Sequence, residues 1–293
     1  MTPLRQRMTE DMQVRNLSPR TQESYLLQVS LFARHFHQSP ALLGPEEIRS
    51  YQVYLTNEKK LATNSILLAV AALRFLYQVT LHKEWSFPEV MPLPHRPNKL
   101  PVVLSPEEVR RFLGSVESVQ QSAVLTTCYA AGLRISEALR LKPNHIDSQR
   151  MVIRVEQGKG QKDRYVMLSP RRLETLRGYW RGVRPKQWLF PGDDPGRPLT
   201  TDAAQKACRK ARSVCGIAKA ITPRSLRHAF AVHLLESGTD VRTIQLLLSH
   251  RSLTTTSRYL RIATSKVCST TSPLDLLPRA VSAEPKPVVP QSF

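Results

Sequence analysis

The segment from Thr222 to Leu260 reads TPRSLRHAFAVHLLESGTDVRTIQLLLSHRSLTTTSRYL. It brings Arg227, His250 and Tyr259 together in a strongly basic protein. A phenol is a poor nucleophile because its unperturbed pKa is about 10. Cations that surround a phenol and face a phosphodiester would make it an effective attacking group, because they stabilise the charge that develops during attack. This segment is therefore the first candidate for chemistry.

Cleavage of a phosphodiester without a metal ion places clear demands on side chains. Cations must hold the two non-bridging oxygens, because negative charge builds up on them in the five-coordinate transition state. A nucleophile must lie in line with the leaving oxygen, and an acid must protonate that oxygen as it departs. Arginine suits the first task because its planar group binds two oxygens and keeps its charge. Lysine suits the acid role because its pKa falls in a cationic site.

Four motifs that contain such residues follow one another along the chain. They are YAAGLRISEALRL, GKGQKDR, TPRSLRHAF and LLLSHRSLTTTSRYL. Their order and spacing resemble those of the tyrosine recombinases, the site-specific recombinases of the phage-integrase and chromosome-dimer-resolving type. One motif alone would be weak evidence, whereas four in order are specific. The resemblance covers nearly the whole chain, because the N-terminal helical part is similar to the core-binding domain of that family.

The resemblance implies a role for each of five residues. Arg134 would be the first arginine that binds the phosphate, and Arg227 the second. Lys159 would be the general acid for the departing 5′ oxygen, and His250 would hydrogen-bond the phosphate. Tyr259 would be the nucleophile that forms a 3′-phosphotyrosine link. That link conserves the bond energy of the cleaved phosphodiester, so rejoining the strand needs no ATP. The resemblance also implies no metal and no other cofactor.

One residue departs from the family pattern. Where the family usually has a histidine that accepts the proton of the attacking tyrosine, this chain has Arg224. An arginine cannot accept a proton, because its pKa lies above about 12. Its charge could still stabilise the phenolate or the phosphate. We therefore expect reduced but real cleavage, and we expect Arg224→His to raise the cleavage rate.

Each of these residues, taken singly, also has a non-catalytic interpretation. Arg134 could be a solvated charge at a helix start, and Lys159 an ordinary turn lysine. His250 could cap a helix C-terminus, and Tyr259 could be a half-buried aromatic residue. Their joint occurrence in order, in a protein of net charge +20, favours an active site.

Other residues in the motifs are expected to support the structure. Glu137 is expected to pair with nearby arginines and so to fix the site. His228 and His233 are five residues apart, which does not suit a paired metal site on one helix face. We interpret both as core or supporting histidines.

The composition indicates a polyanionic partner. Among 293 residues, 43 Lys and Arg oppose 23 Asp and Glu, which gives a net charge of +20 and a pI near 10.3. Nucleic acid is the first candidate and an anionic membrane surface the second. The N-terminus lacks the apolar core of a signal peptide, and the longest apolar run, Ile66 to Leu73, is too short to span a bilayer. We expect a cytoplasmic, nucleoid-associated protein with reduced cysteines.

The length and the local patterns predict a mainly α, multidomain fold. Residues 1–86 are expected to form a helical bundle, the SAM-like core-binding domain, in which helices start at Pro19, Pro45 and about Thr63. Five prolines in residues 87–101 favour an extended linker. Residues 102–272 are expected to form a mixed α/β catalytic domain with a small antiparallel sheet, the DNA breaking-rejoining fold. The tail at 278–293 is expected to be disordered.

Local signals place further elements in the second domain. Ser105 and Glu108 form a capping box at a helix start, and the helices that follow are interrupted at Gly132. Residues 151–155 and 164–168 flank GKGQKD and predict a β-hairpin. Further helices are expected at 170–183, 202–215, 223–236 and 240–248.

These observations predict a site-specific recombinase of double-stranded DNA, with no membrane partner. The resemblance implies a homotetramer on two DNA sites. The absence of an arm-binding domain ahead of residue 1 favours a simple recombinase that serves integration, excision or transposition of a mobile element. Two alternatives stay open: a DNA-binding accessory protein with impaired catalysis, favoured by Arg224, and a type IB topoisomerase, which shares the chemistry but is disfavoured by the compact helical N-terminal domain.

Overall fold

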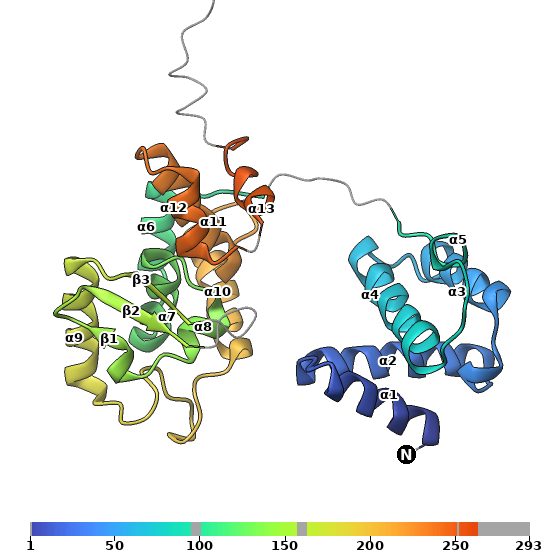
Figure 1. The fold of residues 1–293 in the computed structure, drawn as a ribbon. Helices are drawn as coiled ribbons and strands as arrows, with labels where there is room; N and C mark the ends of the chain where they lie inside the picture. Colours follow the sequence, from blue (N-terminus) through green and yellow to red (C-terminus); the bar gives the residue numbers. More distant parts are fainter. Residues whose placement is uncertain (1, 95–100, 157–162, 251, 263–293) are drawn as a thin grey trace, which may run out of the picture. The chain divides into compact units, whose positions relative to one another are not determined.

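The computed structural model describes residues 2–94, 101–156, 163–250 and 252–262. The chain divides into two compact units, residues 1–99 and residues 100–293, shown in blue to cyan and in green to red (Figure 1). No helix in the described ranges is long and apolar enough to cross a bilayer.

Unit 1 is helical. Its helices are α1 (Pro3–Val14), α2 (Pro19–Phe36), α3 (Pro45–Asn57), α4 (Thr63–Arg74) and α5 (Phe87–Val90), with a 3₁₀ turn at Pro40–Leu42 and a π-helix at Phe75–Thr80 that continues α4. The predicted starts of α2, α3 and α4 are confirmed. Ser18 caps α2 by accepting a hydrogen bond from the Thr21 N–H, so a local signal sets this helix start.

Residues 87–91 differ from the prediction of an extended linker. Phe87–Val90 forms α5, and both Phe87 and Met91 are buried in the core of unit 1. Pro88 is tolerated because it lies in the first turn of the helix, where its nitrogen needs no intrahelical partner. Arg74 donates hydrogen bonds to the carbonyls of Phe87 and Met91. The expectation of extended chain was thus wrong for these residues, whereas 95–100 and the predicted disordered tail lie outside the described residues.

Unit 2 combines helices with a small sheet. Its helices are α6 (Pro106–Gly114), α7 (Val119–Ala130), α8 (Ile135–Leu139), α9 (Pro170–Val183), α10 (Thr201–Cys215), α11 (Pro223–Glu236), α12 (Val241–Leu248) and α13 (Leu253–Ser257). Strands β1 (Ile146–Asp147), β2 (Val152–Val155) and β3 (Arg164–Met167) form an antiparallel sheet in that order. The predicted hairpin is β2 and β3, with Ile153 opposite Val166. The short elements β1 and α13 were not predicted.

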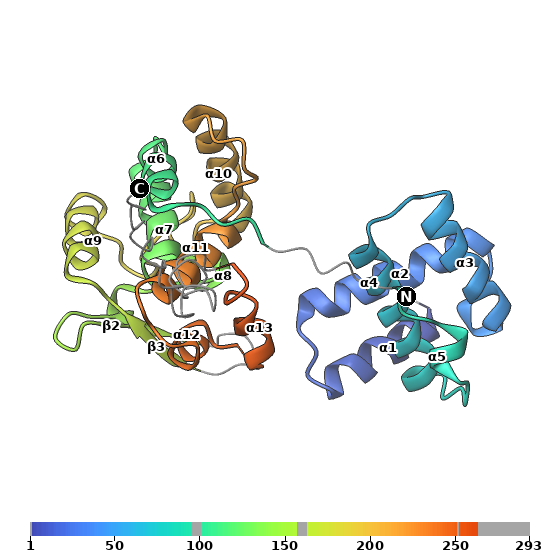
Figure 2. The same ribbon diagram turned by 90° about the horizontal axis from the view of Figure 1, so that it is seen from above.

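Three apolar clusters hold unit 2 together. One joins the sheet to α7 and α9, a second joins α6, α7, α10 and α11, and a third joins α11 to α12 and to Tyr259. Figure 2 shows α11 beside α7, with α12 and α13 following next to it. Helices α7 and α11 therefore form the centre of this unit.

The capping box predicted at Ser105 is confirmed, because Glu108 accepts a hydrogen bond from the Ser105 N–H and Ser105 accepts one from the Glu108 N–H.

The turn between α7 and α8 depends on Gly132. Its φ of +62° lies in the left-handed region, and a Cβ atom there would lie 2.4 Å from Cε1 of Phe230 on α11. Glycine alone allows both the backbone conformation and the close approach of α11. The turn that precedes Arg134 is therefore packed directly against α11.

We predict that Gly132→Ala destabilises unit 2 by about 3 kcal/mol, because it adds backbone strain and a steric clash. Denaturant unfolding followed by circular dichroism would measure the change. Gly178→Ala is the matched control: Gly178 lies within α9 with open space around it, so alanine should stabilise the helix by about 0.5–1 kcal/mol. Equal effects of the two substitutions would contradict the packing argument.

Candidate active site

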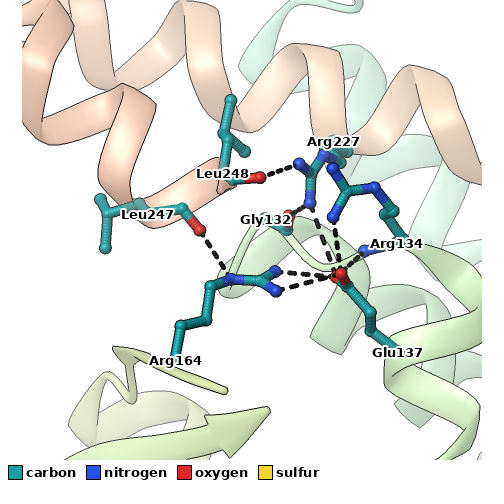
Figure 3. Close-up of polar contacts among 7 residues, drawn as sticks. All are labelled: Gly132, Arg134, Glu137, Arg164, Arg227, Leu247 and Leu248. Carbon is teal, nitrogen blue, oxygen red and sulfur yellow. Dashed lines mark hydrogen bonds and ion pairs between the residues drawn. The ribbon is translucent and has the colours of Figure 1, made fainter. Parts of the chain in front are cut away.

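The carboxylate of Glu137 lies at the centre of a cluster of three arginines (Figure 3). Arg134 Nη1 lies 2.6 Å from Oε1. Arg164 makes a bidentate contact, with Nη1 at 3.0 Å from Oε1 and Nη2 at 2.8 Å from Oε2. Arg227 Nη1 lies 3.6 Å from Oε2. The prediction that Glu137 pairs with nearby arginines is confirmed, and one carboxylate joins residues of α8, β3 and α11.

The local sequence at α8 explains how Glu137 reaches this position. Arg134 is the N-cap residue of α8 and Glu137 is the third residue of the helix. The N–H of Arg134 donates to Oε2 of Glu137 at 2.8 Å, so the carboxylate satisfies a backbone donor that the helix leaves unpaired. The same interaction fixes the start of α8 and orients the Arg134 side chain.

Arg227 is buried on α11 and binds two backbone carbonyls. Nη1 donates to the Gly132 oxygen at 2.6 Å, and Nη2 donates to the Leu248 oxygen at the end of α12. Burial, together with the charge of Arg134, lowers the pKa of Arg227 to about 10, so the group remains charged at neutral pH. This arginine therefore holds α11, α12 and the turn at Gly132 in one arrangement.

Arg164 was not predicted as a site residue. It begins β3, and its Nε donates to the Leu247 carbonyl at 3.2 Å while its two terminal nitrogens bind Glu137. Its signal in the sequence was its position as the last residue of GKGQKDR, whose residue types suggested a turn rather than a contact to the cluster. Arg164 connects the strand that follows this motif to α8 and α12. Lys159 of the same motif lies outside the described residues.

The cluster has more positive than negative charge. Burial alone would raise the pKa of Glu137, but hydrogen bonds and charge from Arg164 and Arg134 hold it at about 2. Three guanidinium groups and one carboxylate leave a net charge of +3 − 1 = +2. The side chain of Arg134 is 27% exposed, whereas those of Arg164 and Arg227 are 9% and 7% exposed. Arg134 is therefore the arginine of this cluster that is most accessible from solvent.

Tyr259 is buried beside this cluster. It follows α13, is 4% exposed and belongs to the apolar cluster of α11 and α12. Its hydroxyl lies 2.8 Å from Nδ1 of His228. Burial raises the pKa of the Tyr259 phenol, while the charges of Arg227, Arg224, Arg258 and Arg134 act to lower it. The phenol is thus held protonated, within reach of cations that would stabilise its anion.

His250 and Arg224 both precede Tyr259 in the sequence and lie near it: the His250 ring faces the phenol, and the charge of Arg224 acts on it. His250 follows α12, its ring is nearly parallel to that of Tyr259 at 6.3 Å between centroids, and its Nδ1 lies 2.9 Å from the Thr256 hydroxyl. Arg224 is exposed in the first turn of α11. Of the predicted site residues, the structure thus brings Arg134, Arg224, Arg227, His250 and Tyr259 to one region of unit 2.

The two histidines of α11 have different surroundings. His233 contacts the Tyr129 hydroxyl through Nδ1 and the Leu104 carbonyl through Nε2, both at 2.9 Å, which agrees with a supporting role. His228 instead touches the hydroxyl of the predicted nucleophile. Its interpretation as a core or supporting histidine was therefore incomplete, because helical spacing cannot show which residue of a distant segment meets an imidazole. Among the described residues, no group of three or more His, Cys, Asp and Glu is arranged to hold a metal ion.

The cluster generates a prediction about stability and pH. The pKa of Glu137 is lower in the folded protein than in an unfolded chain, so its ion pairs stabilise the fold above the unfolded pKa of about 4.3, and this contribution is lost as pH falls toward 2. Glu137→Gln should lower the free energy of unfolding at pH 7 by about 3 kcal/mol, because three cations lose their shared anion. Chemical denaturation between pH 7 and pH 3 would measure this. A variant whose deficit stays constant down to pH 3 would contradict the assignment, and Glu117→Gln, at an exposed ion pair with Lys210, is the control.

Comparison with known proteins identifies the family of this chain. Residues 102–266 match the phage integrase family, and residues 4–87 match its N-terminal SAM-like domain. The chain is 67% identical over its full length to "Putative integrase/recombinase y4qK" of Sinorhizobium fredii, covering 95% of that protein. It is 32% identical to a tyrosine recombinase of Pseudothermotoga lettingae, with 86% of this chain and 90% of that protein covered. Its fold resembles that of the XerH site-specific recombinase bound to a palindromic difH substrate, with a TM-score of 0.71, 22% identity, and 88% and 80% of the two chains covered. The chain belongs to the phage integrase family and is a tyrosine recombinase, an enzyme of site-specific DNA recombination.

Proposed function

We propose that Tyr259 cleaves double-stranded DNA by attacking a backbone phosphodiester. The phenol oxygen bonds to phosphorus, the bond from phosphorus to the 5′ oxygen breaks, and a 3′-phosphotyrosine link forms. The phenol proton leaves as the bond forms, and Lys159 supplies a proton to the departing 5′ oxygen. Attack by a 5′ hydroxyl reverses these steps and rejoins the strand, so neither ATP nor a metal ion takes part.

The observation that carries this proposal is the excess of positive charge that acts on the buried phenol. Arg134 and Arg227 are held by one carboxylate, and their charges act on Tyr259. A phosphate entering beside Arg134 would accept hydrogen bonds from a guanidinium group whose position is already set, so little reorganisation accompanies the reaction. Arg224 and His250 would add charge and hydrogen bonding at the same phosphate.

The partner proposed for this site is double-stranded DNA. A net charge of +20 favours a polyanion, and family membership directs that preference to DNA. We further propose that four protomers act on two DNA sites, exchanging strands in pairs. The biological role proposed is movement of a mobile element, supported by the similarity to proteins named integrase/recombinase.

The test of cleavage is covalent capture. DNA recovered from cells by cross-linking to the protein and sequencing would supply the duplex, and a nicked copy that loses a short fragment after cleavage would trap the intermediate. We expect a protein–DNA adduct on a denaturing gel that disappears in Tyr259→Phe. Tyr129→Phe, which removes a hydroxyl of α7 that is bound to His233 of α11, should keep the adduct. Absence of an adduct from the parent protein under all conditions would support the accessory-protein alternative.

Phosphate binding by Arg134 predicts a distinct salt dependence. The logarithm of the DNA-binding constant should fall linearly with the logarithm of salt concentration, with a slope of about −0.9 for each phosphate neutralised. Arg134→Gln should reduce that slope by about one. Arg197→Gln removes the same charge from an exposed turn where Arg197 pairs with Asp194, and it serves as the charge-matched control. Equal slopes for the two variants would show that Arg134 binds no phosphate.

A further inference from the structure

His228 is placed to take part in the attack by Tyr259. It follows Arg227 on α11, and successive helical residues are rotated by about 100°. That rotation lets Arg227 enter the arginine cluster while Nδ1 of His228 meets the Tyr259 hydroxyl at 2.8 Å. The two rings lie 5.7 Å apart between centroids. The contact is thus a hydrogen bond between a nitrogen base and the oxygen that must lose its proton.

The surroundings of His228 keep it uncharged at neutral pH. Burial, followed by the charges of Arg224, Arg227 and Arg258, lowers the pKa of His228 to about 4. A neutral imidazole has one nitrogen that accepts a hydrogen bond. In the tautomer of His228 that carries its proton on Nε2, the Tyr259 hydroxyl donates and Nδ1 accepts over this 2.8 Å contact. In that tautomer the phenolic proton lies between the oxygen and the nitrogen.

Position 224 lies one helical turn before His228. Residues four apart share a helix face, so Arg224 and His228 both face the region of Tyr259, and the charge of Arg224 acts on both of these groups. Arg224 cannot accept a proton, whereas His228 can.

We propose that His228, in place of residue 224, accepts the phenolic proton of Tyr259 during strand cleavage. The proton passes from Oη of Tyr259 to Nδ1 of His228 while the phenol oxygen bonds to phosphorus and the bond to the 5′ oxygen breaks. This inference rests on the proposed attack by Tyr259. In the reverse reaction the imidazolium returns the proton to the departing phenolate.

The charges around the pair make this transfer dependent on DNA. An imidazolium at His228 would face Arg224 and Arg227 on its own helix and Arg258 beside Tyr259, and repulsion from these cations disfavours it. A bound phosphodiester supplies negative charge that offsets the repulsion. Without DNA, the phenol keeps its proton. The weak basicity of His228 also accounts for the expected gain in Arg224→His, because that substitution removes one of these cations.

The test is the pH dependence of single-turnover adduct formation. Asparagine places an amide oxygen near the position of Nδ1, so His228→Asn preserves a hydrogen-bond acceptor but not a base. We expect a loss of about 100-fold at pH 7, which diminishes as pH rises and the phenol ionises without help. A loss that is constant across the pH range would assign His228 a positioning role only, and an increase in adduct would show that the hydrogen bond restrains Tyr259. Either result overturns the proposal.

Two further variants separate chemistry from folding. His233→Asn disrupts the second histidine–tyrosine pair of α11, with Tyr129, and should leave the pH profile of cleavage unchanged. The double variant Arg224→His with His228→Asn should recover part of the lost rate, because it returns an imidazole to the same helix face. Failure of the double variant to exceed His228→Asn would contradict exchange of the base between these positions.

A measurement without DNA distinguishes failure of this inference from failure of the proposed function. In the protein labelled with ¹⁵N-histidine, NMR should show an unprotonated Nδ1 on His228 at pH 7 whose signal moves in Tyr259→Phe. A protonated Nδ1, or a signal insensitive to that substitution, would overturn the role of His228 even if Tyr259 cleaves DNA. If the NMR signal of His228 is as expected but the parent protein forms no adduct with DNA, the proposed cleavage is refuted. The role of His228 in that reaction is then refuted with it.

Discussion

The arrangement of this site depends on the ion pairs around Glu137. One buried carboxylate receives Arg134 from the start of α8, Arg164 from β3 and Arg227 from α11. Buried charges are costly unless they are paired and hydrogen-bonded, so these elements keep the arrangement that satisfies all four groups. The remaining charge of the cluster is positive. A structural requirement for pairing thus produces a preformed cluster of net positive charge.

The backbone contributes as much to this arrangement as the side chains do. Arg164 and Arg227 donate to the carbonyls of Leu247 and Leu248 at the end of α12, and Arg227 also donates to that of Gly132. These carbonyls lie at a helix end and in a turn, where oxygens lack intrahelical partners. The arginines therefore hold α12, and with it the segment that leads to His250 and Tyr259, against the centre of unit 2. The buried Tyr259 meets both this charge and the imidazole of His228.

Local patterns predicted much of the fold because caps and apolar spacing act over a few residues. Ser18, Ser105 and the run after Pro223 marked helix starts that the structure confirms. Residues 87–91 are not the extended chain that their proline content predicted. Burial of Phe87 and Met91 stabilises a short helix there that local preference alone would not support. Strand β1 is only two residues long and forms by pairing with β2, so no periodicity within it could have revealed it.

The sequence by itself determined the family and the residue types available for chemistry, because motif order is a property of the chain alone. It also determined that Arg224 cannot act as a base, since that follows from the guanidinium group. Only the tertiary structure decided which residues meet. It joined Arg164 to Glu137 across 27 positions and His228 to Tyr259 across 31. Such contacts depend on how helices and strands pack, and the position of the His228 imidazole beside the Tyr259 hydroxyl is a consequence of where α11 lies against the segment after α12.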